Sequence, residues 1–166
     1  MFMYRFKQFI WAISACLEKV DDNILHRYLN ENELDVFKKL QISEQHHSIR
    51  VCKDALLESN SLVNIDREKL AKAALLHDIG KIEKKLTVID KSLIVALDRI
   101  TKGHLRRYTF IKKIDVYYNH PQKATKILKN LGTYDSEFLE IIEKHHYQHI
   151  GNNNYLKIIK KCDDNN

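Results

Sequence analysis

The chain has 166 residues, enough to enclose one sizeable core, and we expect a single domain. Its 44% hydrophobic and 30% charged residues are typical of a globular protein, and no apolar run approaches the about 20 residues that span a bilayer. The excess of 28 Lys and Arg over 22 Asp and Glu gives a net charge of +6, which favours phosphorylated ligands. The basic residues are dispersed, so nucleic acid is left open as a ligand rather than indicated.

Turn-forming residues are scarce, since the whole chain contains four glycines and one proline. Long helices with polar connections are therefore expected rather than a sheet. The three cysteines, Cys16, Cys52 and Cys162, are far apart and odd in number, which indicates neither a disulfide framework nor a thiolate zinc site. This usage fits a reducing compartment, and we expect the protein in the cytoplasm.

Residues 1–42 are expected to form N-terminal helices that pack on the core. Apolar residues between Phe6 and Leu17 recur at three- and four-residue steps, which predicts a first helix with one core-facing side. The run Ile13–Cys16 also resembles a bacterial lipoprotein cleavage box. The helix is the favoured interpretation, because Gln8 leaves an apolar stretch of barely sufficient length for a signal.

Later helices can be placed from capping residues and apolar periodicity. Asp21-Asp22 is expected to cap a helix through Leu29, and Asn32 another through Leu40. Further helices are expected over His47–Glu58, Arg67–His77, Lys91–Thr101, Pro121–Leu131, Glu137–His146 and Tyr155–Cys162.

Three residues mark expected helix ends in this region. Asp66 should cap the helix that begins at Arg67, and Gly80 should stop it. Pro121 should occupy the first position of its helix. No β-type alternation is present, and residues 103–115 have no assigned structure. The expected fold is all-α, with a compact helical domain over residues 43–166.

Helical facing sorts the polar residues, because a side chain shares its face with those three, four and seven positions away. His47 shares a face with apolar positions and His46 with basic ones, so His47 should point inward and His46 toward water. By the same argument Asp163 should point inward and Asp164 outward. The residues expected on converging inner faces are His47, His77, Asp78, His120, His145, His146 and Asp163.

A single buried histidine is more often a hydrogen-bonded core residue than a ligand. The set indicates metal, because inward carboxylates are costly without a cation. Imidazole and carboxylate ligands suit one or two divalent ions, with iron or manganese favoured over magnesium, nickel, cobalt or zinc. Asp78 could bridge two of them.

The sequence also resembles a known family. His47-Ser48, the run Ala-Leu-Leu-His-Asp-Ile-Gly-Lys at residues 74–81, and a terminal Asp163 resemble the HD superfamily of phosphohydrolases in its HDIG-type members. The resemblance covers Ser43 to Asp163 and implies a helical fold with a metal site between helices. Its four-ligand core corresponds to His47, His77, Asp78 and Asp163.

The two-metal branch of that superfamily adds a histidine before proline and an adjacent histidine pair, which correspond to His120 and His145-His146. The bacterial-type HD-GYP cyclic dinucleotide phosphodiesterases share this pattern. The chain has no Gly-Tyr-Pro motif, so cyclic di-GMP is not the expected substrate.

The resemblance implies a phosphohydrolase in which a metal-activated hydroxide attacks a phosphate ester, with Asp78 and Lys81 as catalytic residues. Lys81 resembles the family lysine that contacts substrate phosphate, although a helix-end lysine at the C-terminal dipole fits equally well. The expected partner is a small phosphorylated molecule, a nucleotide monoester or diester, and no membrane. Oligomeric state is left open.

Two alternatives remain at this point. The chain could be a regulatory HD module that binds metal and nucleotide without turnover, although a complete ligand set favours an enzyme. Basic residues in the unassigned segment could contact phosphate or lie on a solvated surface; they are Arg106, Arg107, Lys112 and Lys113.

Overall fold

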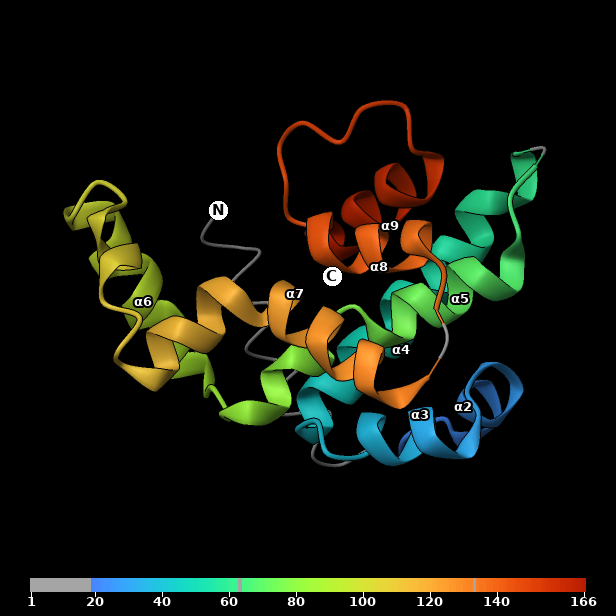
Figure 1. Cartoon of the computed structure of the whole chain (residues 1–166), viewed down its shortest axis with the longest axis horizontal. Helices are drawn as coiled ribbons and strands as arrows, with labels where there is room; N and C mark the ends of the chain where they lie inside the picture. Colours follow the sequence, from blue (N-terminus) through green and yellow to red (C-terminus); the bar gives the residue numbers. More distant parts are fainter. Residues whose placement is uncertain (1–18, 63, 133) are drawn as a thin grey trace.

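The computed structural model describes residues 19–62, 64–132 and 134–166, and all regular structure within them is helical (Figure 1). The all-α prediction is therefore confirmed. The predicted first helix, the cleavage-box alternative and Cys16 lie outside the described residues. The elements are α2 (Asp22–Tyr28), α3 (Glu31–Phe37), α4 (Ile42–Glu58), η1 (Ser59–Ser61), α5 (Arg67–Leu76), η2 (Ile79–Glu83), α6 (Val88–Ile100), η3 (His104–Arg107), α7 (Lys112–Leu131), α8 (Ser136–Lys144) and α9 (Asn154–Asn165).

The centre of the fold is the packing of α4 on α5, with α8 and α9 on one side and α2 and α3 on the other (Figure 1). Small side chains permit this approach, since Ala71, Ala73 and Ala74 of α5 are fully buried. Leucines and isoleucines of α2 to α5 and of α7 to α9 join them in one apolar core. Among the helices described, none has both the length and the apolar character that a membrane-spanning segment requires.

The cap of α3 differs from the prediction. Asn30, not Asn32, caps α3: its Oδ1 accepts from the Glu33 N–H at 2.9 Å while the Glu33 carboxylate accepts from the Asn30 N–H at 2.8 Å. This reciprocal box satisfies two free backbone donors, which fixes the start of the helix there. Asp21 is the N-cap residue of α2 as predicted, and its carboxylate also pairs with Lys53 at 2.7 Å.

The prediction that a helix begins at Pro121 is wrong, because α7 starts nine residues earlier and contains the proline. Proline has no N–H for the carbonyl four residues before it, which is that of Tyr117. The Nδ1 of His120 lies 3.0 Å from this oxygen and can donate to it. The helix continues because the lost backbone bond is replaced by a side-chain bond.

Gly80 has a different role from the helix stop predicted for it. α5 already ends at Leu76, and Gly80 lies in η2, which packs directly on α7. A Cβ atom at this position would lie 2.0 Å from the carbonyl oxygen of His120 and 2.8 Å from the nitrogen of Ala124. Glycine is therefore required for backbone-to-backbone contact.

A projecting arm consists of α6, η3 and the first turns of α7, at the left of Figure 1. It has a small apolar cluster of its own, formed by Ile94, Leu105 and Ile114. α6 begins three residues earlier than predicted, because Thr87 and Asp90 form a capping box at its start. The segment left unassigned by sequence contains η3 and the start of α7.

We expect Gly80→Ala to lower the free energy of unfolding by about 2 kcal/mol or more, because the added methyl group meets main-chain atoms that cannot move aside locally. Gly132→Ala is the matched control, since a Cβ there meets nothing within 4 Å and its φ of 169° suits any residue. Chemical denaturation of both variants measures the difference. Equal stabilities would contradict the close approach of η2 to α7.

Candidate metal centre

Residues on or directly after five helices, α4, α5, α7, α8 and α9, meet at one site. His47 comes from α4, His77 and Asp78 follow α5, and His120 lies in α7. The pair His145-His146 follows α8, and Asp163 lies in the last turns of α9. All seven residues predicted to converge are thus brought together.

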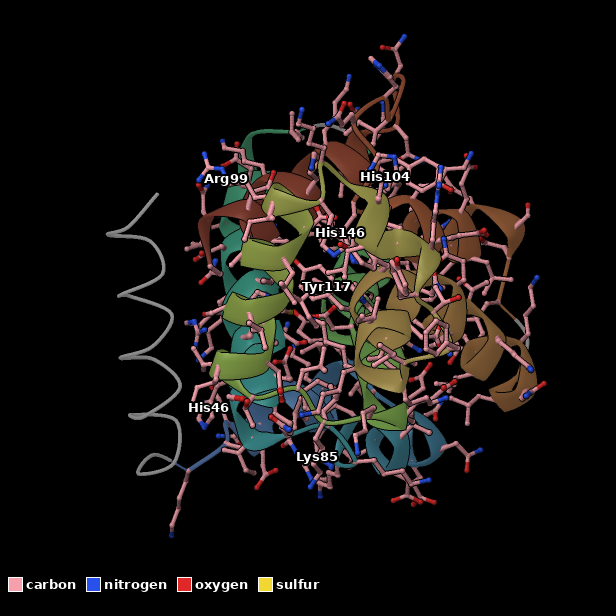
Figure 2. All side chains as sticks on the ribbon, turned by 90° about the vertical axis from the view of Figure 1, so that its left-hand side faces the viewer. His46, Lys85, Arg99, His104, Tyr117 and His146 are labelled. Atoms are coloured by element: carbon pink, nitrogen blue, oxygen red, sulfur yellow. The ribbon has the colours of Figure 1, made fainter. Side chains whose placement is uncertain are left out.

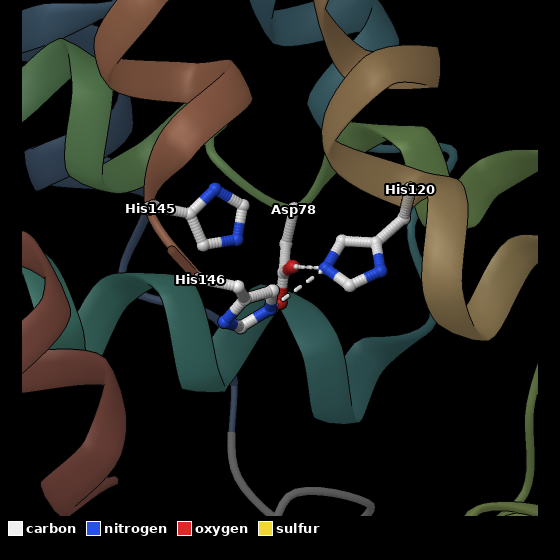
Figure 3. Close-up of side chains that lie close together, drawn as sticks. All are labelled: Asp78, His120, His145 and His146. Carbon is white, nitrogen blue, oxygen red and sulfur yellow. Dashed lines mark hydrogen bonds and ion pairs between the residues drawn. The ribbon is translucent and has the colours of Figure 1, made fainter. Parts of the chain in front are cut away.

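One group of possible ligands surrounds Asp78 (Figure 3). Atoms of Asp78, His120, His145 and His146 all lie within 4.8 Å of one another. Nε2 of His120 is 3.2 Å from Asp78 Oδ1 and 3.0 Å from Nε2 of His146. Three imidazoles and a carboxylate oxygen therefore face a common centre.

A second group adjoins the first. Atoms of His47, His77 and Asp163 also lie within 4.8 Å of one another, with His47 Nε2 at 2.9 Å from Asp163 Oδ1. The other oxygen of Asp78, Oδ2, is 3.7 Å from Nε2 of His47 and 3.5 Å from Nε2 of His77. The Asp78 carboxylate thus directs one oxygen to each group, as a bridging ligand does.

Backbone contacts orient the imidazole rings. His77, His120 and His145 each place Nδ1 beside the carbonyl oxygen three residues earlier, at 2.8, 3.0 and 2.6 Å. Donation from Nδ1 directs Nε2 inward, the arrangement usual for metal-binding histidines, and Nε2 is free to bind a metal when the ring is neutral. Nε2 of His77 and of His145 is buried without a hydrogen-bond partner among the described residues. These orphaned atoms and the N/O donor set fit a divalent metal.

The buried charges need compensation. Burial raises the pKa of Asp78, but Lys81, His77 and His120 outweigh burial and hold that pKa well below its usual range. Burial lowers the pKa of His77, yet the carboxylates of Asp78 and Asp163 reverse the effect and raise it to about 9. In His145, burial and the neighbouring imidazoles lower the pKa well below its usual range. The site therefore holds ionised carboxylates whose charge is partly balanced by a proton on His77.

Sequence reasoning missed one buried acid, Glu44 of α4. Its Oε2 accepts from Lys81 Nζ at 3.0 Å, and its other oxygen contacts Lys91. Burial raises the pKa of Glu44, but the two lysines outweigh it and lower that pKa to about 2. Lys81 also contacts Asp78, so it extends from the metal centre to Glu44. Helical facing could have identified Glu44, because it precedes His47 by three residues and shares its face.

A cavity of about 1070 Å³ adjoins the two ligand groups and extends toward the arm. Lys81, Lys91 and Arg106 are the basic residues on its arm side, and Tyr117 and Tyr118 supply aromatic surface. Figure 2, which looks onto the arm, shows Tyr117 and His146 between the ribbons of α6 and α7. The metal centre is thus accessible from a space much larger than a phosphate group.

Asp164 and His46, which adjoin the predicted ligands Asp163 and His47 in the sequence, differ in their exposure to solvent. Asp164 is exposed and pairs with Lys160 at 3.3 Å, as helical facing predicts. His46 is only half-exposed, and its Nε2 is enclosed without a hydrogen-bond partner among the described residues. His46 therefore faces water only in part, and it belongs to neither ligand group.

The other candidate residues lie outside the ligand groups. Arg106 lines the cavity, whereas Lys112 pairs with Glu83 and Lys113 with Asp90. Cys52 and Cys162 are buried free thiols. Neither belongs to the clusters of possible metal ligands found in the described residues.

Comparison with known families agrees with the site. A sequence model of the HD domain matches residues 45–164. The chain belongs to the HD domain family. The match includes every residue of the two ligand groups and most of the described structure, and the HD family includes metal-dependent hydrolases. No curated protein and no solved structure gives a match.

We expect Asp163→Ala to lower the metal content of this HD domain at least about 10-fold, because it removes an oxygen shared by His47 and His77. Asp164→Ala is its control and should retain metal, since that carboxylate lies on the solvent side. His47→Ala should likewise lower the metal content, and its control His46→Ala should retain metal. Elemental analysis after anaerobic reconstitution measures all four, and equal losses within a pair would argue against the site.

Metal binding is also expected to release a proton. With a pKa of about 9, His77 is protonated near neutral pH in the metal-free site, whereas a metal ligand must be unprotonated. Affinity for Mn²⁺ should therefore rise with pH and level off above the pKa of His77. Calorimetric titration in buffers of different ionisation enthalpy counts the protons, and no release near pH 7 would contradict this protonation state.

Proposed function

We propose that this HD domain protein is an HDIG-type phosphohydrolase with a two-metal centre. The observation that carries the proposal is Asp78, whose two carboxylate oxygens face separate groups of imidazole ligands. His120, His145 and His146 would hold one ion, and His47, His77 and Asp163 the other, with Asp78 between them. Divalent ions in these positions would activate water and polarise a phosphoryl group.

Lys81 is proposed to orient the substrate phosphate. Its ammonium group lies between Asp78 and Glu44 and lines the cavity. Burial of Glu44 fixes the lysine at the border between metal centre and cavity, and a compact cation suits contact with a phosphate oxygen. The interpretation as a helix-end lysine is less well supported, because Lys81 contacts two acidic side chains.

The cavity supports a nucleotide-sized substrate. Its volume of about 1070 Å³ exceeds what inorganic phosphate needs, and Tyr117 and Tyr118 offer flat apolar surface. Asp98 lies close enough to Tyr118 to affect its pKa, which burial and this carboxylate raise. Asp98 Oδ1 and the Tyr118 hydroxyl are both buried, and the Asp98 carboxylate lies within hydrogen-bonding reach of that hydroxyl. We propose that they receive polar groups of the base.

The proposed substrate is a small nucleotide rather than cyclic di-GMP, because no Gly-Tyr-Pro motif follows the histidine pair. The free thiols Cys52 and Cys162 support a reducing compartment such as the cytoplasm. These assignments rest on chemistry of the chain and on membership of the HD domain family.

Hydrolysis of a panel of nucleoside monophosphates, triphosphates and cyclic nucleotides, followed by chromatographic separation of the products, tests the proposal. We expect Mn²⁺- or Fe²⁺-dependent hydrolysis of at least one, and a loss of about 100-fold or more in Asp78→Asn, whose helical circular dichroism is retained. Metal and nucleotide binding without turnover would instead identify a regulatory module. Full activity in Asp78→Asn would place the reaction elsewhere.

Substrate selection is expected to depend on Asp98. Asp98→Asn should raise KM for the best nucleotide about 10-fold, with p-nitrophenyl phosphate hydrolysis unchanged, because only the nucleotide reaches the α6 wall. Glu140→Gln is the control, because that acid is exposed and pairs with Lys144 on the surface of α8. A similar loss of activity on the nucleotide and on p-nitrophenyl phosphate would show that Asp98 has a structural role.

A further inference from the structure

Glu44 holds two lysines beside the cavity. Its carboxylate oxygens accept separately from Lys81 of η2 and from Lys91 of α6, so one acid joins three distant segments of the chain. Glu44 is only 6% exposed, and both lysines line the cavity. A single carboxylate compensates only one of two ammonium groups, so this wall of the cavity attracts anions.

Lys91 is the lysine of the pair with capacity for a further anion. Lys81 is held between Asp78 and Glu44. The side chain of Lys91 is 34% exposed, and within the described residues it forms an ion pair with Glu44 alone. An ammonium group has three N–H donors, so Lys91 can donate to an anion in the cavity and keep its contact with Glu44.

The contacts of these groups lead away from the candidate metal centre. Lys81 contacts Asp78 on one side and Glu44 on the other. Glu44 in turn contacts Lys91, which belongs to neither ligand group. A phosphoryl group at the metal centre would therefore lie beside Lys81, and a second phosphoryl group attached to it would lie near Lys91.

The inner face of α6 continues in the same direction. Lys91, Val95 and Asp98 follow one another at steps of four and three residues, and all three line the cavity. They share one side of the helix, and Lys91 and Asp98 are separated by about 10 Å along its axis. A nucleoside with one phosphate has a comparable length. A phosphoryl group at Lys91 thus places the attached base near Asp98.

We propose that Lys91 binds a second phosphoryl group, and that the substrate is therefore a nucleotide with a diphosphate linkage, in its simplest form a nucleoside diphosphate. The terminal phosphoryl group lies at the metal centre, the inner one at Lys91 and the base at Asp98. This assignment rests on the proposed phosphohydrolase function and narrows its substrate class. A nucleoside monophosphate has one phosphoryl group and cannot occupy both positions.

The arrangement also favours cleavage of the diphosphate linkage. A water oxygen bonds to the terminal phosphorus, and the bond from that phosphorus to the bridging oxygen breaks. The bridging oxygen leaves with the electron pair as part of the inner phosphoryl group, and one proton of the water is released to solvent. The products are a nucleoside monophosphate and inorganic phosphate. Lys91 stabilises the negative charge that develops on the leaving oxygen.

Steady-state kinetics of the Mn²⁺-reconstituted protein tests the role of Lys91. The wild type should have a higher kcat/KM for its best nucleoside diphosphate than for the corresponding monophosphate. Lys91→Gln keeps an N–H donor for Glu44 but loses the charge. It should lower kcat/KM for the diphosphate, relative to that for p-nitrophenyl phosphate, by about 10- to 100-fold, as expected for a lost contact with a charged group.

Two further variants serve as controls. Lys91→Arg keeps a cation and should retain most of the preference for the diphosphate. Lys85→Gln should behave as the wild type, because Lys85 is exposed and lies outside the cavity lining. Circular dichroism of all three variants should match that of the wild type.

Binding gives a measurement that needs no turnover. In calorimetric titrations the wild type should bind methylenediphosphonate, a diphosphate analogue that is not hydrolysed, more tightly than inorganic phosphate. Lys91→Gln should lose about 10-fold more affinity for the diphosphonate than for phosphate.

Equal losses on both ligands and on both substrates, or a wild type that prefers the monophosphate, would overturn the assignment of Lys91 and leave the phosphohydrolase function intact. Failure of that function would look different, because the wild type would then hydrolyse neither nucleotides nor p-nitrophenyl phosphate. In that case the diphosphonate titration alone decides whether Lys91 binds a second phosphoryl group.

Discussion

The rest of the site depends on the burial of the Asp78 carboxylate, which is 1% exposed. An isolated ionised carboxylate in such a position is strongly destabilising, so each neighbouring element supplies positive charge or a donor. Lys81 comes from η2, His120 from α7 and His47 from α4. The helices converge where these groups can reach Asp78, and a bound cation would complete the same compensation.

The position of His120 results from two residues that contribute no ligand atom. Gly80 allows α7 to approach η2 at the carbonyl of His120, and Pro121 leaves the Tyr117 carbonyl free for the His120 ring. The close approach at Gly80 fixes where the imidazole lies. The free carbonyl of Tyr117 fixes which ring nitrogen faces the site. Both are backbone constraints, so an otherwise conservative substitution at either position would act on the site through geometry.

The sequence predicted the all-α class and the convergence of the ligand residues, because helical facing depends only on local periodicity. The facing argument was correct for His47 and Asp163. Each shares its helix face with apolar residues, and that face packs inward. The sequence prediction failed for Pro121, because the proline is tolerated where a side chain replaces a backbone donor. For His46 the facing argument was only partly right, because that side chain is half-buried. Glu44 shares the face of His47, but the lysines that contact it come from distant segments, so the sequence does not show its partners.

The cavity wall and the candidate ligand groups are held by different parts of the fold. Lys91 and Asp98 of α6 line the cavity. The arm that carries α6 has a small apolar cluster of its own, whereas the helices that carry the two ligand groups pack in the main core. The ligand groups contain no residue of α6. A shift of α6 would therefore alter contacts with the organic part of a substrate more than the geometry of the candidate metal centre.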